Sequence, residues 1–185
     1  MVRNELKDHM ETKKTIFILV GPPSIGKSHW VEDHQPHAFW LSRDQCVDEV
    51  RKPHGLRYSE MFSPQNLGRF RGEIDHLYRL KSGEALSSGR DIVVDMTNMG
   101  VKARRRALGI IRGREGEFTT VAVVFDHRGK ESLVWDSIQR RAAKLNDKFV
   151  PYFVLRDMFQ RFEMPTTGEG FDRVEFADTT KAIGA

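Results

Sequence analysis

The chain has 185 residues, of which 39% are hydrophobic and 30% are charged. This length suits one α/β domain with its own core and leaves little room for a second. No apolar stretch reaches the length of a membrane span or a secretory signal, so we expect an intracellular, cytoplasmic protein, of a cell or of a phage-infected host. The single cysteine, Cys46, has no internal disulfide partner, and its apolar helix face favours a buried structural thiol.

The formal net charge of +4 favours a polyanionic partner such as nucleic acid. Clustered Lys and Arg side chains bind a phosphate backbone by releasing its counterions. Many basic proteins of this size bind only a small anion, however, so charge alone does not decide the partner. The densest basic run, at residues 102–106, also has apolar neighbours at helical spacing, which equally fits the solvated face of an amphipathic helix.

Residues 1–14 are polar and of mixed charge, which predicts a frayed lead-in before a single domain over residues 15–185. Apolar runs predict five buried strands, at residues 15–20, 38–41, 91–95, 119–126 and 173–176. Helical spacing predicts helices at residues 26–34, 43–50, 65–86, 102–112, 131–143 and 152–162. The longest loops are expected at residues 52–63 and 143–150. Strands alternating with helices predict an α/β fold, with a mostly parallel five-stranded sheet covered by helices on both faces.

The first predicted strand runs directly into a phosphate-binding pattern, G-x-x-x-x-G-K-S. Its residues are Gly21, Pro22, Pro23, Ser24, Ile25, Gly26, Lys27 and Ser28. The glycines allow backbone N–H groups to surround nucleotide phosphates, Lys27 can reach the β and γ oxygens, and the Ser28 hydroxyl can ligate Mg²⁺. We therefore expect a P-loop fold that binds ATP or another nucleoside triphosphate together with Mg²⁺.

Two other strands end in carboxylates at the same edge of the predicted sheet, where α/β proteins bind ligands. Asp44 follows the second strand, and there it can take the proton of an attacking hydroxyl or simply cap the next helix. Asp95 ends the third strand, the usual place for a carboxylate that acts on Mg²⁺ directly or through water. Thr97 and Asn98 after it can equally be turn residues that start the next helix.

A basic segment over residues 139–144 precedes the polar loop at 143–150 and predicts a lid. Arg140 and Arg141 on such a hinged segment can swing over a triphosphate and neutralise the charge of the transition state. Basic residues are also favourable at the C-terminus of any helix, and the two interpretations are compatible.

Together these motifs resemble the 5′-polynucleotide kinase family. The resemblance covers residues 15–177, and it includes Phe162-Glu163-Met164-Pro165-Thr166 and Glu169-Gly170-Phe171 near the end. It implies that Lys27 and Ser28 hold ATP and Mg²⁺, that Asp44 is the general base, and that Arg141 or Arg140 is the lid arginine. It also implies nucleic acid as the acceptor.

One position departs from part of that family. Phage-type members carry an arginine three residues after the catalytic aspartate, to grip the phosphate of the acceptor, whereas this chain has Val47 there; mammalian-type members also lack that arginine. The grip on the acceptor is therefore unassigned. The candidates are Arg43, Arg51, Arg57, Arg69 and Asn98. The length leaves no room for an added phosphatase domain, so we expect a kinase domain alone.

Three classes of function follow from these motifs. The first is a kinase that phosphorylates a hydroxyl of nucleic acid, either a 5′-OH end or, as in phage kinases of similar core, hydroxymethyluracil within DNA. The second is a P-loop kinase of a small molecule such as a nucleoside or an antibiotic. The third is a nucleotide switch without catalytic activity. The sequence favours the first class and contains no signal for the oligomeric state.

Overall fold

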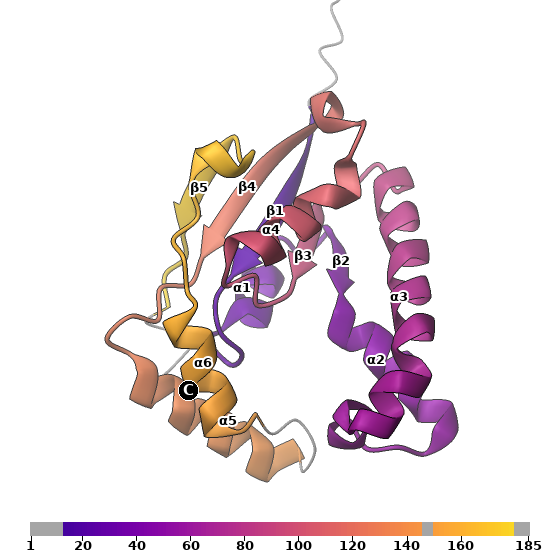
Figure 1. Ribbon diagram of the computed structural model, residues 1–185. Coiled ribbons are helices and arrows are strands. Elements are labelled where there is room, and N and C mark those ends of the chain that lie inside the picture. Colours follow the sequence, from indigo (N-terminus) through magenta and orange to yellow (C-terminus); the bar gives the residue numbers. More distant parts are fainter. Residues whose placement is uncertain (1–12, 146–149, 180–185) are drawn as a thin grey trace, which may run out of the picture.

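The computed structural model describes residues 13–145 and 150–179, and it has a five-stranded sheet at its centre (Figure 1). The strands stand in the order β2-β3-β1-β4-β5, and every pairing is parallel. Their bounds are β1 Lys14–Val20, β2 Phe39–Ser42, β3 Ile92–Asp95, β4 Phe118–Val124 and β5 Arg173–Phe176. The α/β prediction is confirmed. Because parallel strands all end at one edge, the loops after β1, β2 and β3 meet there.

The helices alternate with the strands as the sequence predicts. They are α1 Lys27–His34, α2 Arg43–Arg51, α3 Pro64–Ser87, α4 Val101–Leu108, α5 Glu131–Leu145 and α6 Tyr152–Gln160. The helix expected at 102–112 ends at Leu108 and continues as a 3₁₀ turn, and the fourth strand ends at Val124. The expected loop at 52–63 contains two 3₁₀ turns, Lys52–His54 and Ser59–Phe62. Residues 1–12 of the expected lead-in and 146–149 of the expected lid loop lie outside the described residues, and residues 143–145 belong to α5.

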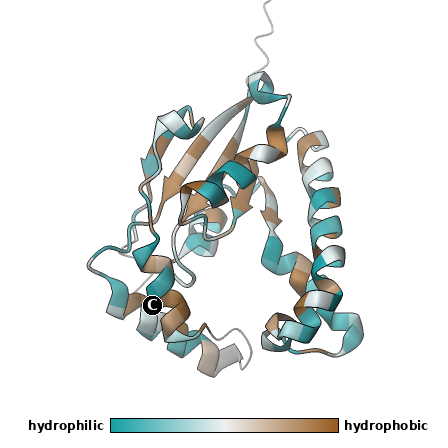
Figure 2. Cartoon of the chain, in the orientation of Figure 1, coloured by the Kyte–Doolittle hydropathy of each residue, from teal (hydrophilic) through white to brown (hydrophobic). Residues whose placement is uncertain are grey.

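Successive side chains of β1 enter two different cores, one on each face of the sheet. Ile16 and Ile18 pack with residues of α3 and α4, whereas Phe17 and Leu19 pack with residues of α1, α5 and α6. Figure 2 shows the apolar strands inside and mixed polar and apolar helices around them. A strand buried on both faces reads as a continuous apolar run, which is why this segment has no alternating pattern. Helices on both faces are thereby confirmed.

A third apolar cluster lies away from the sheet, between α2 and α3. It contains Cys46, Val47, Val50, Met61, Phe70 and Ile74. The Cys46 thiol is fully buried and donates a hydrogen bond to the Ser42 carbonyl oxygen at 3.5 Å, and burial raises its pKa. The thiol therefore packs as a small apolar group, as the sequence predicts. Among the described helices, none is long and apolar enough to cross a membrane.

Candidate active site

The phosphate loop between β1 and α1 has backbone conformations that restrict its sequence. Gly26 has φ 98° at the N-cap of α1, a left-handed conformation that glycine adopts without strain. Gly21 lies so close to Phe125 that an added Cβ would stand 2.8 Å from the Phe125 Cβ. Ser24, with φ 58°, is one of two described non-glycine residues with a positive φ. Two glycines and one strained serine thus shape the loop.

This loop is tied to its neighbours on two sides. The Gly21 N–H donates a hydrogen bond to the Thr97 carbonyl oxygen at 2.9 Å, at the end of β3. The Ser137 hydroxyl of α5 donates to the Ser24 carbonyl oxygen at 3.3 Å. The phosphate loop, the end of β3 and the middle of α5 are therefore held as one unit.

Lys27 starts α1 and keeps its ammonium group inside the loop. Its Nζ donates to the carbonyl oxygens of Gly21 at 3.1 Å and Pro22 at 2.7 Å, and only 9% of the residue is exposed. Burial lowers the pKa of Lys27, while the negative charges of Asp95 and Asp44 oppose that shift. These carboxylates are thus close enough to act on the ammonium, and they favour its charged form against the effect of burial.

A cavity of about 510 Å³ opens in front of this loop. Its walls come from the phosphate loop and α1, from the start of α2, from the end of β3 and from α5. It is lined by Pro23, Ser24, Gly26, Lys27, Ser28, His29, Arg43, Asp44, Asp95, Met96, Thr97, Ser137 and Arg141. The structure therefore brings the predicted phosphate loop, both predicted carboxylates and one lid arginine to a single cavity.

Asp95 lies at the end of β3, where its carboxylate is held by a neighbouring strand. The Trp40 Nε1–H of β2 donates to Asp95 Oδ2 at 3.1 Å. Burial raises the pKa of Asp95, and the charge of Lys27 and the hydrogen bond from Trp40 act against this rise. The indole thus favours the ionised carboxylate, the form that a metal ion needs.

Ser28 and Asp95 offer oxygen donors on the same cavity, and these donors fit Mg²⁺. Within the described residues, no group of three or more His, Cys, Asp or Glu side chains could hold a metal ion. Mg²⁺ characteristically binds through one or two protein oxygens and takes its other ligands from phosphates and water. The donor set therefore suits a metal that arrives with a nucleotide.

Asp44 occupies the first turn of α2, and Ser42 is the N-cap residue. The interpretation of Asp44 as the cap itself is therefore wrong, although its charge still suits a helix N-terminus. Its side chain is exposed, and its Oδ1 accepts a hydrogen bond from the Tyr58 hydroxyl at 2.8 Å. Tyr58 is a residue that sequence reasoning missed. Its partner is 14 residues away and lies beyond a loop, so no periodic pattern links the two.

The two predicted lid arginines are on α5 but differ in position. Arg141 lines the cavity, and its positive charge acts on Lys27, Asp95 and Tyr58. Arg140 does not line it. Neighbouring helical residues project about 100° apart, so both side chains cannot face the same cavity equally. The structure thus separates two arginines that the sequence left as alternatives.

Among the candidate acceptor arginines, only Arg43 lines the cavity, and its guanidinium pairs with Asp75 at 2.7 Å. Arg51 instead donates to Asp48 and to the Leu56 carbonyl oxygen.

Arg57 and Arg69 also lie outside the cavity lining. The Arg57 guanidinium pairs with Glu60 at 3.0 Å, and that of Arg69 lies over the Phe70 ring at 4.7 Å. Arg51 and Arg57 thus bond within the segment between α2 and α3, and Arg69 contacts its neighbour in α3. A role of these three arginines at the acceptor stays a prediction.

Asn98 is likewise a structural residue. It is 1% exposed, has φ 46°, and its Nδ2 donates to the Leu19 carbonyl oxygen at 2.8 Å. Its side chain thus ties the connection after β3 to β1, and its burial leaves little surface for an acceptor. The N-cap residue of α4 is Gly100, so Asn98 lies before the start of that helix.

The basic run on α4 contains a buried member, Arg104, with no exposed surface. Its guanidinium forms two hydrogen bonds with the Glu169 carboxylate, at 2.7 and 2.8 Å. It also donates to the carbonyl oxygens of Asn98, Met99 and Glu163. Arg104 thus joins the turn after β3 to the C-terminal segment. The solvated-face interpretation is wrong for this residue, because the partner that buries it is 65 positions away.

The fold and this site define a P-loop domain that takes a nucleoside triphosphate. A family model described as an AAA domain matches residues 16–165. The chain therefore belongs to this family of P-loop domains. A search of the curated proteins finds no significant match.

Solved structures share the fold at low sequence identity. A candidate kinase from Chloroflexus aurantiacus has a TM-score of 0.63 at 16% identity, over 91% of this chain and 86% of its own. For a gluconokinase from Sinorhizobium meliloti the TM-score is 0.50 at 15% identity, over 92% and 87%. For a fungal RNA kinase it is 0.49 at 14% identity, over 93% and 80%. The first two similarities support the fold, and at these identities they leave the acceptor open.

Proposed function

We propose that the chain is an ATP-dependent kinase that transfers the γ-phosphoryl group to a hydroxyl of nucleic acid, most simply the 5′-OH end of DNA or RNA. One observation carries the proposal: Lys27 of the phosphate loop and the exposed carboxylate of Asp44 line the same cavity. A nucleotide on the loop and a hydroxyl at Asp44 would therefore meet in one space, with Arg141 on the wall formed by α5. This arrangement suits phosphoryl transfer, which depends chiefly on positioning and electrostatic stabilisation.

In this mechanism Asp44 is the general base. The acceptor hydroxyl gives its proton to the Asp44 carboxylate while its oxygen forms a bond to the γ-phosphorus. The bond from that phosphorus to the β–γ bridging oxygen breaks, and ADP leaves with the electron pair. Lys27 and Arg141 neutralise the charge that builds on the phosphoryl oxygens. The Tyr58 hydroxyl holds one carboxylate oxygen of Asp44, so the other is available for the proton.

Ser28 and Asp95 would hold Mg²⁺, with Trp40 orienting the Asp95 carboxylate. When bound, the metal supplies positive charge to the β- and γ-phosphate oxygens. Asp95 is thereby distinct from Asp44: the first is partly buried and fixed by an indole, while the second is exposed to an incoming acceptor. Two carboxylates in different surroundings suit two different tasks.

Nucleic acid is the favoured acceptor because of the net charge of +4 and the resemblance to polynucleotide kinases. Hydroxymethyluracil within DNA is an alternative with the same core chemistry. A small-molecule acceptor is the other alternative.

The experiment that tests this proposal measures transfer of labelled γ-phosphate from ATP with Mg²⁺ to a panel of acceptors. The panel contains 5′-OH DNA and RNA oligonucleotides, a hydroxymethyluracil duplex with blocked ends, free nucleosides and free sugars. We expect labelled 5′-OH ends, with a KM that rises steeply with salt. Labelling of the duplex alone would identify the modified base as the acceptor. Labelling of small molecules alone would overturn the proposal that the acceptor is nucleic acid. No labelling of any hydroxyl would favour a nucleotide switch.

A further inference from the structure

The segment between α2 and α3 lies directly beside the carboxylate that we propose as the base. Its Tyr58 hydroxyl donates to Asp44 Oδ1 at 2.8 Å, and Asp44 lines the cavity. Burial and the neighbouring Asp44 charge raise the pKa of Tyr58 well above its ordinary value, so the phenol stays protonated and remains a donor. The charge of Arg141, on the opposite wall, also acts on this phenol. Tyr58 therefore stands at the border of the cavity.

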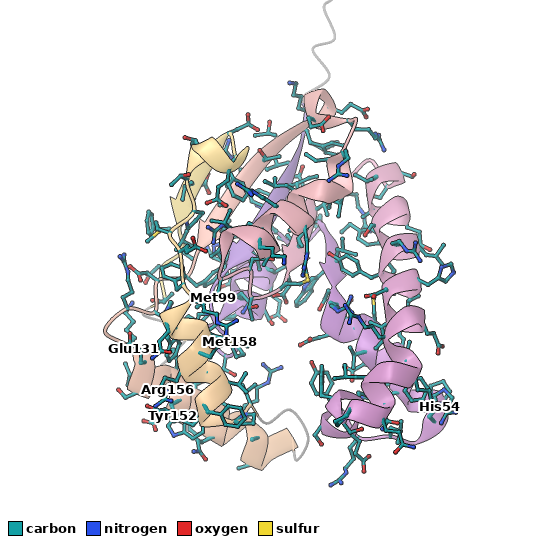
Figure 3. The ribbon with its side chains drawn as sticks, in the orientation of Figure 1. His54, Met99, Glu131, Tyr152, Arg156 and Met158 are labelled. Atoms are coloured by element: carbon teal, nitrogen blue, oxygen red, sulfur yellow. The ribbon has the colours of Figure 1, made fainter. Side chains whose placement is uncertain are left out.

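A second aromatic side chain, Phe62, packs against Tyr58. The ring centroids of Tyr58 and Phe62 are 5.0 Å apart, with an angle of 55° between the ring planes. Phe62 is 49% exposed, whereas its chain neighbour Met61 is 1% exposed. An exposed flat surface thus lies one ring away from Asp44. His54 of the same segment lies on the outer side of this wall, away from α5 and α6 (Figure 3).

The side chains of neighbouring residues hold the backbone around Phe62 in place. Met61 is 1% exposed and packs in the cluster between α2 and α3. The Asn66 side chain donates to the Glu60 carbonyl oxygen at 2.9 Å, and the Ser63 hydroxyl caps α3 by accepting from the Asn66 N–H. The exposed ring is therefore carried on a fixed turn, which lowers the entropy that a ligand must remove.

Three arginines on or near this wall pair with acidic residues. Arg43 pairs with Asp75, Arg51 with Asp48 and Arg57 with Glu60. Val47, one turn after Asp44, is 4% exposed and packs in the core. Beside Asp44 this wall therefore offers an aromatic face in addition to Arg43, whose charge is paired with Asp75. Such a face recognises a flat apolar group.

We propose that Tyr58 and Phe62 form an acceptor shelf, on which the Phe62 ring stacks against the unpaired base of the nucleotide that presents its hydroxyl to Asp44. Tyr58 is the positioning residue of this shelf, because its hydroxyl holds the Asp44 carboxylate. The inference rests on the proposed function and names its substrate class: an unpaired nucleic-acid end. Aromatic stacking suits such an end because every base has a π face, which also makes the contact tolerant of sequence.

The test compares two single-stranded 5′-OH oligonucleotides that differ only at the first residue, which either carries its base or is abasic. KM and kcat for each are measured at saturating ATP. For the unaltered chain we expect the abasic end to raise the acceptor KM by about fivefold or more, the range of one base–aromatic stack. Phe62→Ala should raise the KM of the base-bearing end by a similar factor, and the abasic end should then cause no additional rise.

Two further variants at position 62 distinguish an effect of the aromatic ring from an effect of side-chain volume. Phe62→Tyr keeps a ring and should keep the preference for the base, whereas Phe62→Leu keeps apolar volume and should lose it. Leu80→Ala, which truncates a side chain of α3 that is 52% exposed, is the control and should change neither constant. Tyr58→Phe should lower kcat about tenfold with little change in KM, because the ring stays and only the hydroxyl that holds Asp44 is lost.

An equal penalty for the abasic end in the unaltered chain and in Phe62→Ala overturns the shelf while leaving the kinase proposal intact. Labelling of free sugars that depends on Phe62 also overturns it, since the ring would then face a sugar. If no oligonucleotide is labelled although another acceptor is, the proposed nucleic-acid function fails and the shelf fails with it.

Discussion

The two walls of the cavity are built in different ways. The wall with the phosphate loop follows the central strands β1 and β3, and it is held by a backbone hydrogen bond, by the buried Gly21 and by the enclosed Lys27. The wall with Asp44 grows from β2, at the edge of the sheet, and rests on a small separate cluster. Its key contact joins two side chains, Tyr58 and Asp44. Backbone contacts do not depend on side-chain identity, so they suit the nucleotide that all such domains bind. Exposed side chains at the edge of the sheet can change without disturbing the fold, so they suit the acceptor, which differs between enzymes.

The largest effect on phosphoryl transfer is expected from the phosphate-loop wall, when the ammonium group of Lys27 is removed. Lys27→Ala should lower transfer by about 10³-fold or more, because the charge on the phosphoryl oxygens would lose its nearest cation. The measurement is kcat with a 5′-OH oligonucleotide, with Lys14→Ala, an exposed residue at the start of β1, as the control. Near-normal turnover in Lys27→Ala would remove the phosphate loop from the mechanism.

The matching change on the other wall is Asp44→Asn. It should lower kcat by about 10²- to 10³-fold, since the amide cannot take the acceptor proton. ATP affinity, measured by calorimetry, should stay nearly the same because the phosphate loop is intact. Glu49→Gln, a similar exposed change on the same helix, should keep full transfer. A joint loss of ATP binding and transfer in Asp44→Asn would indicate a structural role at the start of α2 instead.

The buried ion pair between Arg104 and Glu169 is expected to affect stability rather than phosphoryl transfer. Glu169→Gln should lower the free energy of unfolding at pH 7 by about 3 kcal/mol, because it leaves Arg104 buried opposite a neutral group. Burial alone would raise the pKa of Glu169, but the hydrogen bonds and charge of Arg104 hold it below the ordinary 4.5.

A carboxylate with a lowered pKa contributes stability that is complete above pH 4.5 and is lost as pH falls through the folded value. In denaturant unfolding, the difference in the free energy of unfolding between Glu169→Gln and the unaltered chain should therefore become smaller below pH 4.5. A difference that does not change with pH would mean that Glu169 stabilises the fold by packing and not by its charge.

The smallest effect is expected from the comparison of the two arginines on α5. Arg141→Ala should lower kcat by about tenfold or more, since its side chain lines the cavity, and Arg140→Ala should change it less. Both variants are measured at saturating ATP and acceptor. Equal losses in the two variants would contradict the assignment of the lid cation to Arg141 alone.

Much of the phosphate-loop wall could be read in the sequence because its signals are local. The eight residues of the loop are contiguous, and the apolar run before them identifies the strand. The positions of Asp44 and Asp95 were also predictable, since Asp44 comes two residues after β2, Asp95 is the last residue of β3, and parallel strands end at one edge. The sequence could not choose among the candidate acceptor cations, because only the structure shows that Arg43 lines the cavity while Arg51, Arg57 and Arg69 lie outside its lining.

By itself, then, the sequence determined the phosphate loop, the alternation of strands and helices, and the two carboxylates at the strand ends, because all of these depend on neighbours along the chain. Only the tertiary structure decided that Arg104 is buried on Glu169, that Arg141 rather than Arg140 reaches the cavity, and that Tyr58 holds Asp44. The physical reason is the same in each case. A cation or a phenol takes its role from the partner it meets in space, and here that partner is set by the packing of helices against the sheet.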